Sequence, residues 1–385
     1  VDAYVTNIVN LQQKHREHGV FCYSLGDEGV TRGCCVHPAC LAAYRGYLEE
    51  QYGDIAALNA SWDTAYAAFA DVDLLDHQDN MENGALKQGL YARWYDRQAF
   101  ARVNLSRFSK RFGDAYRTLD PQAITGFEGT GAFGDDYDAI VGMNGFYGPY
   151  PSLGDDIVRS LAPRHQLRSN WMGYSKTADA LTDAAWRMVM KGMDSIWFWM
   201  WTGTGAYRGF VTPTLDLYPA TAELTEEMQP VRDGLGDLLL NSTMTHSGIA
   251  ILYSLPSALA QQIEHAASFA KCELVHETWA NTIYELGLDY RYITDGALHA
   301  GGLTTAEFKV LILPTTMSLA PDQAAEIRRY VEAGGQVLAD VRPGVFDGHC
   351  KPLEKGSLDD LFGFGRVSRG EAQPGALTLK GELMG

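Results

Sequence analysis

Apolar segments that alternate with amphipathic helices constrain the fold of this chain more than any other feature. In the first 240 residues, apolar runs without polar alternation predict buried strands at 20–25, 123–128, 139–144, 166–174 and 195–201. Helical spacing of apolar residues predicts helices at 38–52, 56–62, 91–119 and 178–190. Because strands that alternate with helices form parallel sheets, this order favours an α/β fold, and specifically a (β/α)8 TIM barrel.

A second α/β pattern begins after a change in composition near residues 240–244. Strands are predicted at 248–253, 290–293, 309–314 and 336–340, with helices at 259–287 and 321–333. This is the doubly wound layout of flavodoxin-like proteins, but no GxGxxG or P-loop accompanies it, so nucleotide binding has no support. We expect a barrel domain at 1–243, an α/β domain at 244–370, and the start of a truncated further domain at 371–385.

The charge of the chain argues against several classes of partner. The formal net charge is −17, so nucleic acid and anionic membranes would be repelled. No apolar run approaches the ~20 residues that a membrane helix needs. Residues 1–18 have neither the basic start nor the apolar middle of a signal peptide, and we expect a bacterial cytoplasmic protein. The chain lacks an initiator Met, which suggests a piece of a longer protein.

Carboxylates follow the first two predicted strands. Asp27 and Glu28 come directly after the strand at 20–25, and Glu128 ends the strand at 123–128. Barrel enzymes place catalytic groups at the carboxyl ends of their strands, although an acidic pair can also simply begin a solvated loop. Glycines flank Glu128 and allow the backbone to approach a ligand closely, which favours a functional role.

Two segments of the sequence resemble family 42 β-galactosidases. The first is Glu28-Gly, Cys35-Val-His37-Pro-Ala-Cys40 and Tyr52-Gly-Asp-Ile-Ala-Ala-Leu-Asn59-Ala-Ser-Trp62-Asp-Thr64. The second, Gly334-Gly-Gln-Val-Leu-Ala-Asp340-Val-Arg-Pro-Gly344, is similar to the trimerisation domain of that family. The resemblance implies a (β/α)8 barrel, two catalytic glutamates, retention of anomeric configuration and a homotrimer. It also implies that the chain begins near the third barrel helix, without the first three strands.

The resemblance assigns roles to the carboxylates. Glu28 takes the fourth-strand position of the general acid/base, and Asp27 stands where the family has an Asn that donates to a sugar hydroxyl. An ionised Asp can only accept. The family nucleophile ends the seventh strand, where this sequence has no carboxylate between Arg168 and Tyr174. Glu128 is the nearest carboxylate that could replace it, as nucleophile or base. Alternatively, Glu128 binds a sugar hydroxyl or caps the loop.

Aromatic and polar side chains near the predicted strand ends are candidates for sugar binding. Aromatic rings can stack on the apolar faces of sugars, and the candidates are Trp171, Tyr174 and Trp201. Asn144 and Tyr147 are placed at the sixth strand tip, where the family has sugar-contacting groups, with plain loop residues as the alternative.

A cysteine cluster follows the first strand. The pattern Cys35-x-His37-x-x-Cys40 has ligand types that suit tetrahedral zinc, and three unligated residues are the alternative. By resemblance, a fourth ligand comes from the missing upstream segment, although Cys34 could serve. Such a structural zinc site would fix the loop after the catalytic strand. No organic cofactor is expected.

The sequence therefore predicts a glycoside hydrolase that acts on terminal β-glycosidic bonds, with Glu28 as general acid/base and a carbohydrate as its substrate. The alternative is a carbohydrate-binding pseudoenzyme of the same fold, because the seventh-strand glutamate is absent. The sequence does not name the sugar, the linkage or the anomeric outcome.

Overall fold

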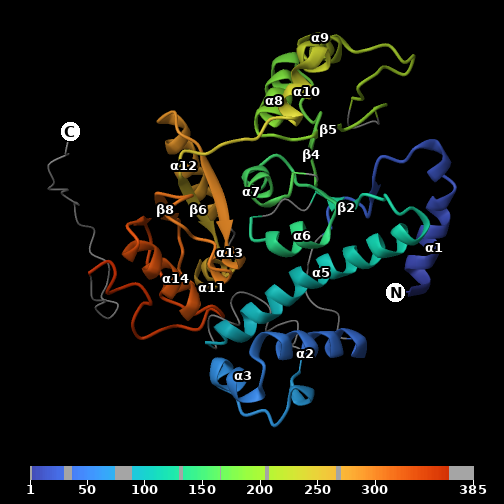
Figure 1. Cartoon of the computed structure of the whole chain (residues 1–385). Helices are drawn as coiled ribbons and strands as arrows, with labels where there is room; N and C mark the ends of the chain where they lie inside the picture. Colours follow the sequence, from blue (N-terminus) through green and yellow to red (C-terminus); the bar gives the residue numbers. More distant parts are fainter. Residues whose placement is uncertain are drawn as a thin grey trace.

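The computed structural model describes residues 2–29, 37–73, 89–129, 133–164, 166–203, 208–265 and 270–363, and its elements are labelled in Figure 1. Two parallel sheets organise this part of the chain, and each is covered by helices.

The first sheet is half of a barrel. Its strands are β1 Tyr23–Ser24, β2 Thr125–Glu128, β3 Phe146–Gly148, β4 Leu167–Met172 and β5 Ser195–Phe198. They lie in the order in which they occur in the chain, and all described pairings between them are parallel. Consecutive parallel strands joined by helices are the arrangement of a (β/α)8 barrel. The predicted partial barrel is confirmed, although β1 and β5 are shorter than the apolar runs that contain them.

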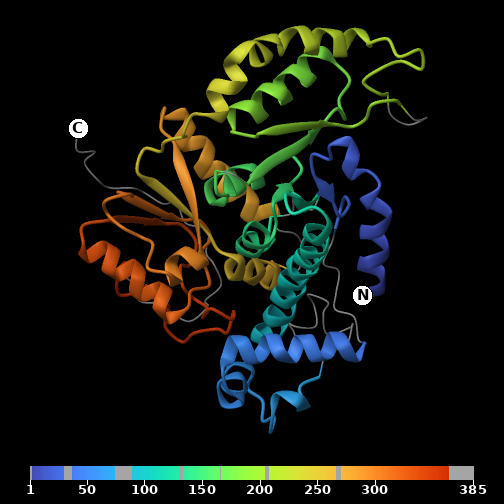
Figure 2. The same cartoon turned by 45° about the vertical axis from the view of Figure 1, so that its right-hand side comes forward.

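Helices cover the outer face of this sheet. The long helix α5 Tyr91–Leu119 joins β1 to β2, and α6 Tyr137–Met143, α7 Gly154–Leu161 and α8 Ala178–Met190 join the later strands. After β5 the chain continues through α9 Pro219–Glu227 and α10 Gly236–Leu240. Figure 2 shows α1 Asp2–Gln13 beside the end of α5, whereas α2 Pro38–Tyr52 and α3 Ile55–Trp62 lie against its first half.

The predicted strand at 139–144 is wrong, because this segment belongs to helix α6. The Asp136 side chain accepts a hydrogen bond from the backbone N–H of Ala139 and caps the helix, which the apolar run alone does not reveal. The strand of this unit, β3, lies just after this segment, where no strand was predicted. A short apolar run fits a buried strand and a buried helix equally well, so the cap decided between them.

The second sheet has the strand order β7-β6-β8-β9, and its described pairings are all parallel. Its strands are β6 Ile249–Tyr253, β7 Tyr290–Thr294, β8 Val310–Leu313 and β9 Gln336–Ala339, with helices α11 Leu255–His265, α12 Ala270–Glu285, α13 Asp295–His299 and α14 Pro321–Glu332. The order 2-1-3-4 is that of doubly wound sheets. The single helix predicted at 259–287 is wrong, because α11 and α12 are separate elements. The predicted domain boundaries and the trimerisation role stay predictions.

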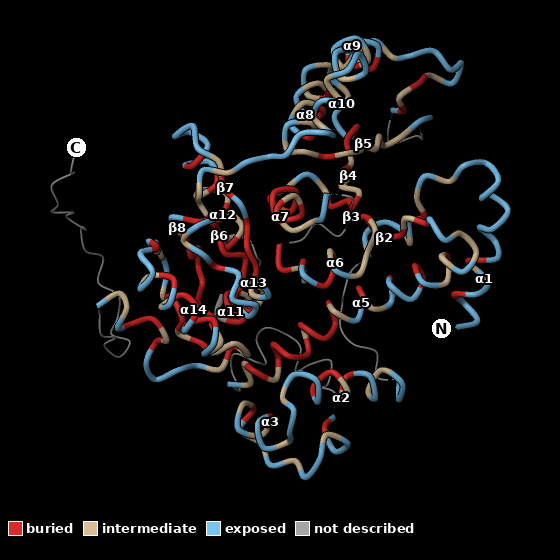
Figure 3. Tube along the Cα trace, in the orientation of Figure 1, coloured by how far each residue is buried: buried red, intermediate tan, exposed pale blue. Residues whose placement is uncertain are grey.

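The two sheets share a core. Phe127 and Tyr147 from the half-barrel belong to the same buried cluster as Ile251 and Tyr292 from the second sheet. The backbone N–H of Tyr292 donates to the Ser160 hydroxyl at the end of α7, at 2.9 Å. Figure 3 shows that buried residues are concentrated in the second sheet and along the first half of α5. Within the described residues, no helix is both long and apolar enough to cross a bilayer.

Candidate active site

Two glutamates lie at the ends of neighbouring strands of the half-barrel. The backbone N–H of Glu28 donates to the carbonyl of Glu128 at 3.1 Å, and the N–H of Glu128 donates to the carbonyl of Gly26 at 3.3 Å. The pairing of β1 with β2 therefore continues to the carboxyl ends of both strands. These bonds place Asp27, Glu28 and Glu128 together where barrel enzymes carry their catalytic groups.

Tyr150 connects the acids after β1 to the end of β3. Its hydroxyl lies 3.0 Å from Glu28 Oε1 and 3.2 Å from Asp27 Oδ1. Because β2 lies between β1 and β3, the Tyr150 side chain crosses the end of the strand that carries Glu128. Partial burial, the Tyr174 hydroxyl and the Glu28 carboxylate raise the pKa of Tyr150. The phenol therefore stays protonated and can donate to these acids.

Glu128 is the buried carboxylate of the group, with 6% of its surface exposed. The Ser24 hydroxyl donates to its Oε1 at 2.6 Å, whereas its Oε2 has no hydrogen-bond partner among the described residues. Burial is the largest influence on the pKa of Glu128 and raises it, and the Asp27 charge adds to this. The Ser24 hydroxyl and the Trp171 indole act in the opposite direction, but the net shift is upward. A raised carboxyl pKa beside a second acid is a feature of catalytic pairs.

Gly129 permits this close approach of the strands. Its φ is +69°, and a Cβ at this position would lie 1.8 Å from Asp27 Oδ1 and 2.8 Å from the backbone nitrogen of Glu28. No other residue fits without displacing one of the acids. Glu28 itself has a φ of 53°, in the left-handed region that costs a non-glycine residue about 1–2 kcal/mol.

An aromatic group lies on the same part of the sheet. Trp171 and Trp197 are paired in register on β4 and β5, and their rings are 5.4 Å apart. Trp199 lies 6.0 Å from Trp171. Tyr174 is 45% exposed and its ring lies 6.1 Å from that of Tyr150. The structure therefore brings Trp171 and Tyr174 towards the acids, and their role in sugar binding stays a prediction.

Trp201 lies beyond the end of β5. It is 63% exposed, and its ring is stacked on Phe210 at 5.9 Å with an interplanar angle of 8°. The exposed face of this ring is available to a ligand, so its predicted role as a platform stays a prediction.

The structure does not bring Asn144 and Tyr147 to the carboxylates. Asn144 lies between α6 and β3, at the amino end of the strand, and its amide donates to the Ile140 carbonyl at 2.8 Å. Tyr147 is 1% exposed and packs edge-to-face on Phe127, in the core shared with the second sheet. Their placement at the sixth strand tip is wrong, because it assumed a strand at 139–144 where α6 lies.

Sequence reasoning missed Ser24 and Tyr150. Ser24 is the last residue of β1, before the turn that leads to Asp27. Its hydroxyl also accepts from the backbone N–H of Gly26 at 3.1 Å. Tyr150 follows Gly148-Pro149 after β3. The Gly-Pro pair indicates the end of a strand, and Tyr150 is the first side chain after it that carries a hydroxyl.

Comparisons with known proteins agree with the fold. The family model Glyco_hydro_42, described as beta-galactosidase, matches residues 3–115. A beta-galactosidase from Thermus thermophilus is 49% identical over 45 residues, which are 10% of this chain and 7% of that protein. The structure of a cold-adapted beta-galactosidase from Rahnella sp. R3 has a TM-score of 0.74 at 16% identity, and covers 94% of this chain. Residues 3–115 thus resemble family 42 β-galactosidases, and the chain as a whole has the fold of solved β-galactosidases.

Other β-galactosidase structures give the same fold. The beta-galactosidase from Bacillus circulans has a TM-score of 0.74 at 16% identity over 93% of this chain, and that from the psychrophilic Marinomonas ef1 has 0.66 at 17% over 93%. The chain spans 57% of the Rahnella and Bacillus chains and 61% of the Marinomonas chain. Glu28 lies inside the segment that the family model matches, whereas Glu128 lies beyond it.

The predicted metal ligands of this family 42-like chain are only partly described. Cys35 lies outside the described residues. His37 is the N-cap of α2, and its Nδ1 accepts from the backbone N–H of Ala39 at 3.2 Å. Cys40 is half-buried in the first turn of the same helix. Within the described ranges, no three His, Cys, Asp or Glu side chains are grouped to hold an ion, so the zinc site stays a prediction.

The hydrogen bond from Ser24 predicts a pH effect. Because this bond lowers the pKa of Glu128, the Ser24→Ala variant should have a Glu128 pKa higher still. If Glu128 acts as a carboxylate, the acidic limb of the kcat/KM profile moves to higher pH, since ionisation then requires a higher pH. Movement of the alkaline limb instead would make Glu128 the proton donor. An unchanged pH profile would contradict the expectation that ionisation of Glu128 affects kcat/KM.

Proposed function

We propose that this chain belongs to a glycoside hydrolase that acts on terminal β-glycosidic bonds. One observation carries this: an exposed and a buried glutamate stand at adjacent strand ends, linked through their backbones and facing an aromatic group. Glycoside cleavage requires two carboxyl groups of different protonation around one anomeric carbon. Glu28 and Glu128 lie in different environments, since one is exposed and the other is nearly sealed from water.

Glu28 is proposed as the general acid/base. Its exposure allows a leaving group to reach it, and the Tyr150 hydroxyl fixes one carboxyl oxygen. The glycosidic C–O bond breaks as the leaving oxygen takes the Glu28 proton. Water then supplies a hydroxyl to the anomeric carbon and returns its proton to Glu28.

Glu128 is proposed as the carboxylate that stabilises the positive charge on the sugar. Its Oε2 is buried and has no hydrogen-bond partner among the described residues, whereas Oε1 is held by Ser24. The end of β4, where the family nucleophile is expected, carries Trp171 and Met172 and no carboxylate. Glu128 lies at the end of β2 and not of β4, so its negative charge is one strand away from Glu28.

Further groups are proposed to bind the substrate. Asp27 can accept hydrogen bonds from sugar hydroxyls, and Trp171, Tyr174 and Trp201 offer aromatic faces. A structural zinc held by Cys35, His37 and Cys40 would fix the loop that follows the acids. A homotrimer built through the second sheet is the assembly that the family resemblance suggests.

The missing carboxylate on β4 favours one alternative, a pseudoenzyme that binds carbohydrate without cleaving it. Such a protein would keep the aromatic wall and the acids as hydrogen-bond acceptors. Turnover separates it from the enzyme, since both would bind sugars.

A panel of nitrophenyl and unactivated β-glycosides tests the proposal. We expect the full chain to hydrolyse at least one β-glycoside, and Glu28→Gln to lower kcat/KM by about 10²–10⁴-fold on unactivated substrates. The loss should be smaller for nitrophenyl glycosides, because their leaving groups need no proton. Glu49→Gln, on an exposed face of α2, is the matched control and should retain full activity. Sugar binding without turnover on the whole panel would favour the pseudoenzyme.

A further inference from the structure

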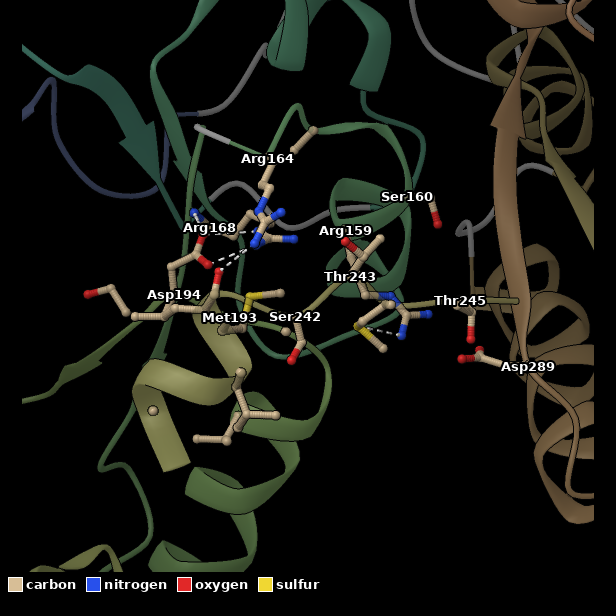
Figure 4. Close-up of a pocket in the computed structure, with 18 of the residues that line it drawn as sticks. Arg159, Ser160, Arg164, Arg168, Met193, Asp194, Ser242, Thr243, Thr245 and Asp289 are labelled. Atoms are coloured by element: carbon tan, nitrogen blue, oxygen red, sulfur yellow. Dashed lines mark hydrogen bonds and ion pairs between the residues drawn. The ribbon is translucent and has the colours of Figure 1, made fainter. Parts of the chain in front are cut away.

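A cavity of about 530 Å³ lies at the opposite end of the half-barrel strands from the acids. Arg168 near the start of β4 and Ser195 at the start of β5 border it, as do residues of β7 in the second sheet (Figure 4). Its size is in the range of small-molecule sites, roughly 300–1,000 Å³. The cavity is therefore separate from the candidate active site and independent of the proposed function.

The cavity has one apolar wall. Helices α8 to α10 and the adjoining segments provide Val189, Met193, Ile196, Met228, Val231, Leu239 and Leu240. A wall of this kind favours a ligand with an apolar part, because contact with it removes apolar surface from water.

The facing wall is rich in arginine. Arg159, Arg164, Arg168 and Arg291 line the cavity, against the two aspartates Asp194 and Asp289. Figure 4 shows Arg164 and Arg168 beside Asp194, and Arg159 nearer the second sheet. The chain as a whole has a net charge of −17, so an excess of arginines around one cavity runs against its overall charge. Carboxylates pair with most of these arginines, so an anionic ligand is favoured only by an arginine that has no such partner.

The four arginines are not equally engaged. Arg168 forms an ion pair with Asp194 at 2.8 Å, Arg159 with Asp156 at 3.2 Å, and Arg291 with Glu307 at 2.9 Å. Arg164 has a single hydrogen bond, to the Leu240 carbonyl at 3.3 Å, and no carboxylate partner in the described part of the chain. It is exposed, so its remaining N–H groups are free to bind an anion.

The segment that joins the two sheets adds donors. Thr243 and Thr245 border the cavity, and no hydrogen bond to another described residue engages their hydroxyls. Ser242 differs, because its hydroxyl already donates to the Leu238 carbonyl at 2.6 Å. Arg164 thus provides the cavity with a charged fork, and the two threonines provide neutral donors, with Thr245 beside Asp289 in Figure 4.

We propose that this cavity binds a small organic anion. Arg164 holds its carboxylate or phosphate group, because the guanidinium fork matches both in a bidentate manner. The apolar body of the ligand lies against Met193 and Leu239. Because the lining comes from the half-barrel and from β7, the bound anion stabilises the junction between the two sheets.

Calorimetry and thermal unfolding of the full chain test this proposal with defined probes. Hexanoate and hexyl phosphate distinguish the two head groups, inorganic phosphate lacks the apolar body, and hexanol lacks the charge. We expect saturable binding and a higher Tm with hexanoate or hexyl phosphate, weaker binding of inorganic phosphate, and none of hexanol.

Substitution of the free arginine provides the second arm. Arg164→Gln should weaken binding of the preferred anion by about ten- to a hundredfold, the range for a hydrogen-bonded charge, and Arg164→Lys by less. Arg187→Gln is the control, because Arg187 is exposed on α8 and paired with Asp183 outside the cavity. Unaltered binding by Arg164→Gln, equal losses in both variants, or no saturable binding of any anion would overturn the proposal. Tighter binding of inorganic phosphate than of either hexyl probe would overturn the role of the apolar wall.

Discussion

Replacement of Glu128 by alanine should lower kcat/KM for an aryl β-glycoside by about a thousandfold or more. The reason is that Glu128 is buried and is bonded to Glu28 through the backbone, and a carboxylate shielded from water stabilises an oxocarbenium ion more strongly. The isosteric Glu128→Gln variant should lose a similar factor, since the charge and not the shape is removed. Rates on one nitrophenyl glycoside measure both variants.

Azide distinguishes the roles of Glu128. If it is the nucleophile, azide enters the space left in Glu128→Ala, restores part of the rate and gives a glycosyl azide of configuration opposite to the substrate. The matched Glu28→Ala variant should instead give an azide product of retained configuration. A raised KM with little change in kcat would contradict the nucleophile and leave Glu128 as a ligand of a sugar hydroxyl. The configuration of each product is read by NMR.

The sequence was sufficient for elements with strong local signals. The helix α5 follows from its apolar spacing and from the Asp120-Pro121 stop, and α2 ends at Gly53, as expected for glycine after a helix. The candidate acids Glu28 and Glu128 were found for a similar reason, because each lies at the carboxyl end of an apolar run.

Features that depend on distant contacts were beyond the sequence. The bond from Ser24 to Glu128 joins residues 104 positions apart, and the bond from Tyr150 to Glu28 joins residues 122 positions apart. Neither follows from local spacing. Asn144 and Tyr147 were misplaced because one run, 139–144, could not be assigned to helix or strand without its Asp136 cap.

Loss of Asp96 should destabilise the protein more than the loss of any surface charge. Its carboxylate is fully buried and lies 2.6 Å from the Tyr52 hydroxyl, 2.7 Å from Trp62 Nε1 and 2.6 Å from His349 Nδ1. These bonds connect α5 to α2, to α3 and to the segment after β9. Asp96→Ala should lower the free energy of unfolding by about 3–5 kcal/mol, since it leaves buried donors unpaired. Asp63→Asn, which removes an exposed ion pair with Lys351 close by, should cost about 1 kcal/mol or less.

The same network gives stability a defined pH dependence. Burial lowers the pKa of His349, but the charge and hydrogen bond of Asp96 outweigh it, and the net shift is upward. Protonated His349 therefore stabilises the folded chain fully below the ordinary histidine pKa of about 6.5, and this contribution is lost as the pH rises through the folded-state value. Urea unfolding at a series of pH values should show this loss in the native chain and not in Asp96→Asn. An equal slope in both proteins would mean that His349 binds no additional proton on folding, and that the bond to Asp96 is neutral.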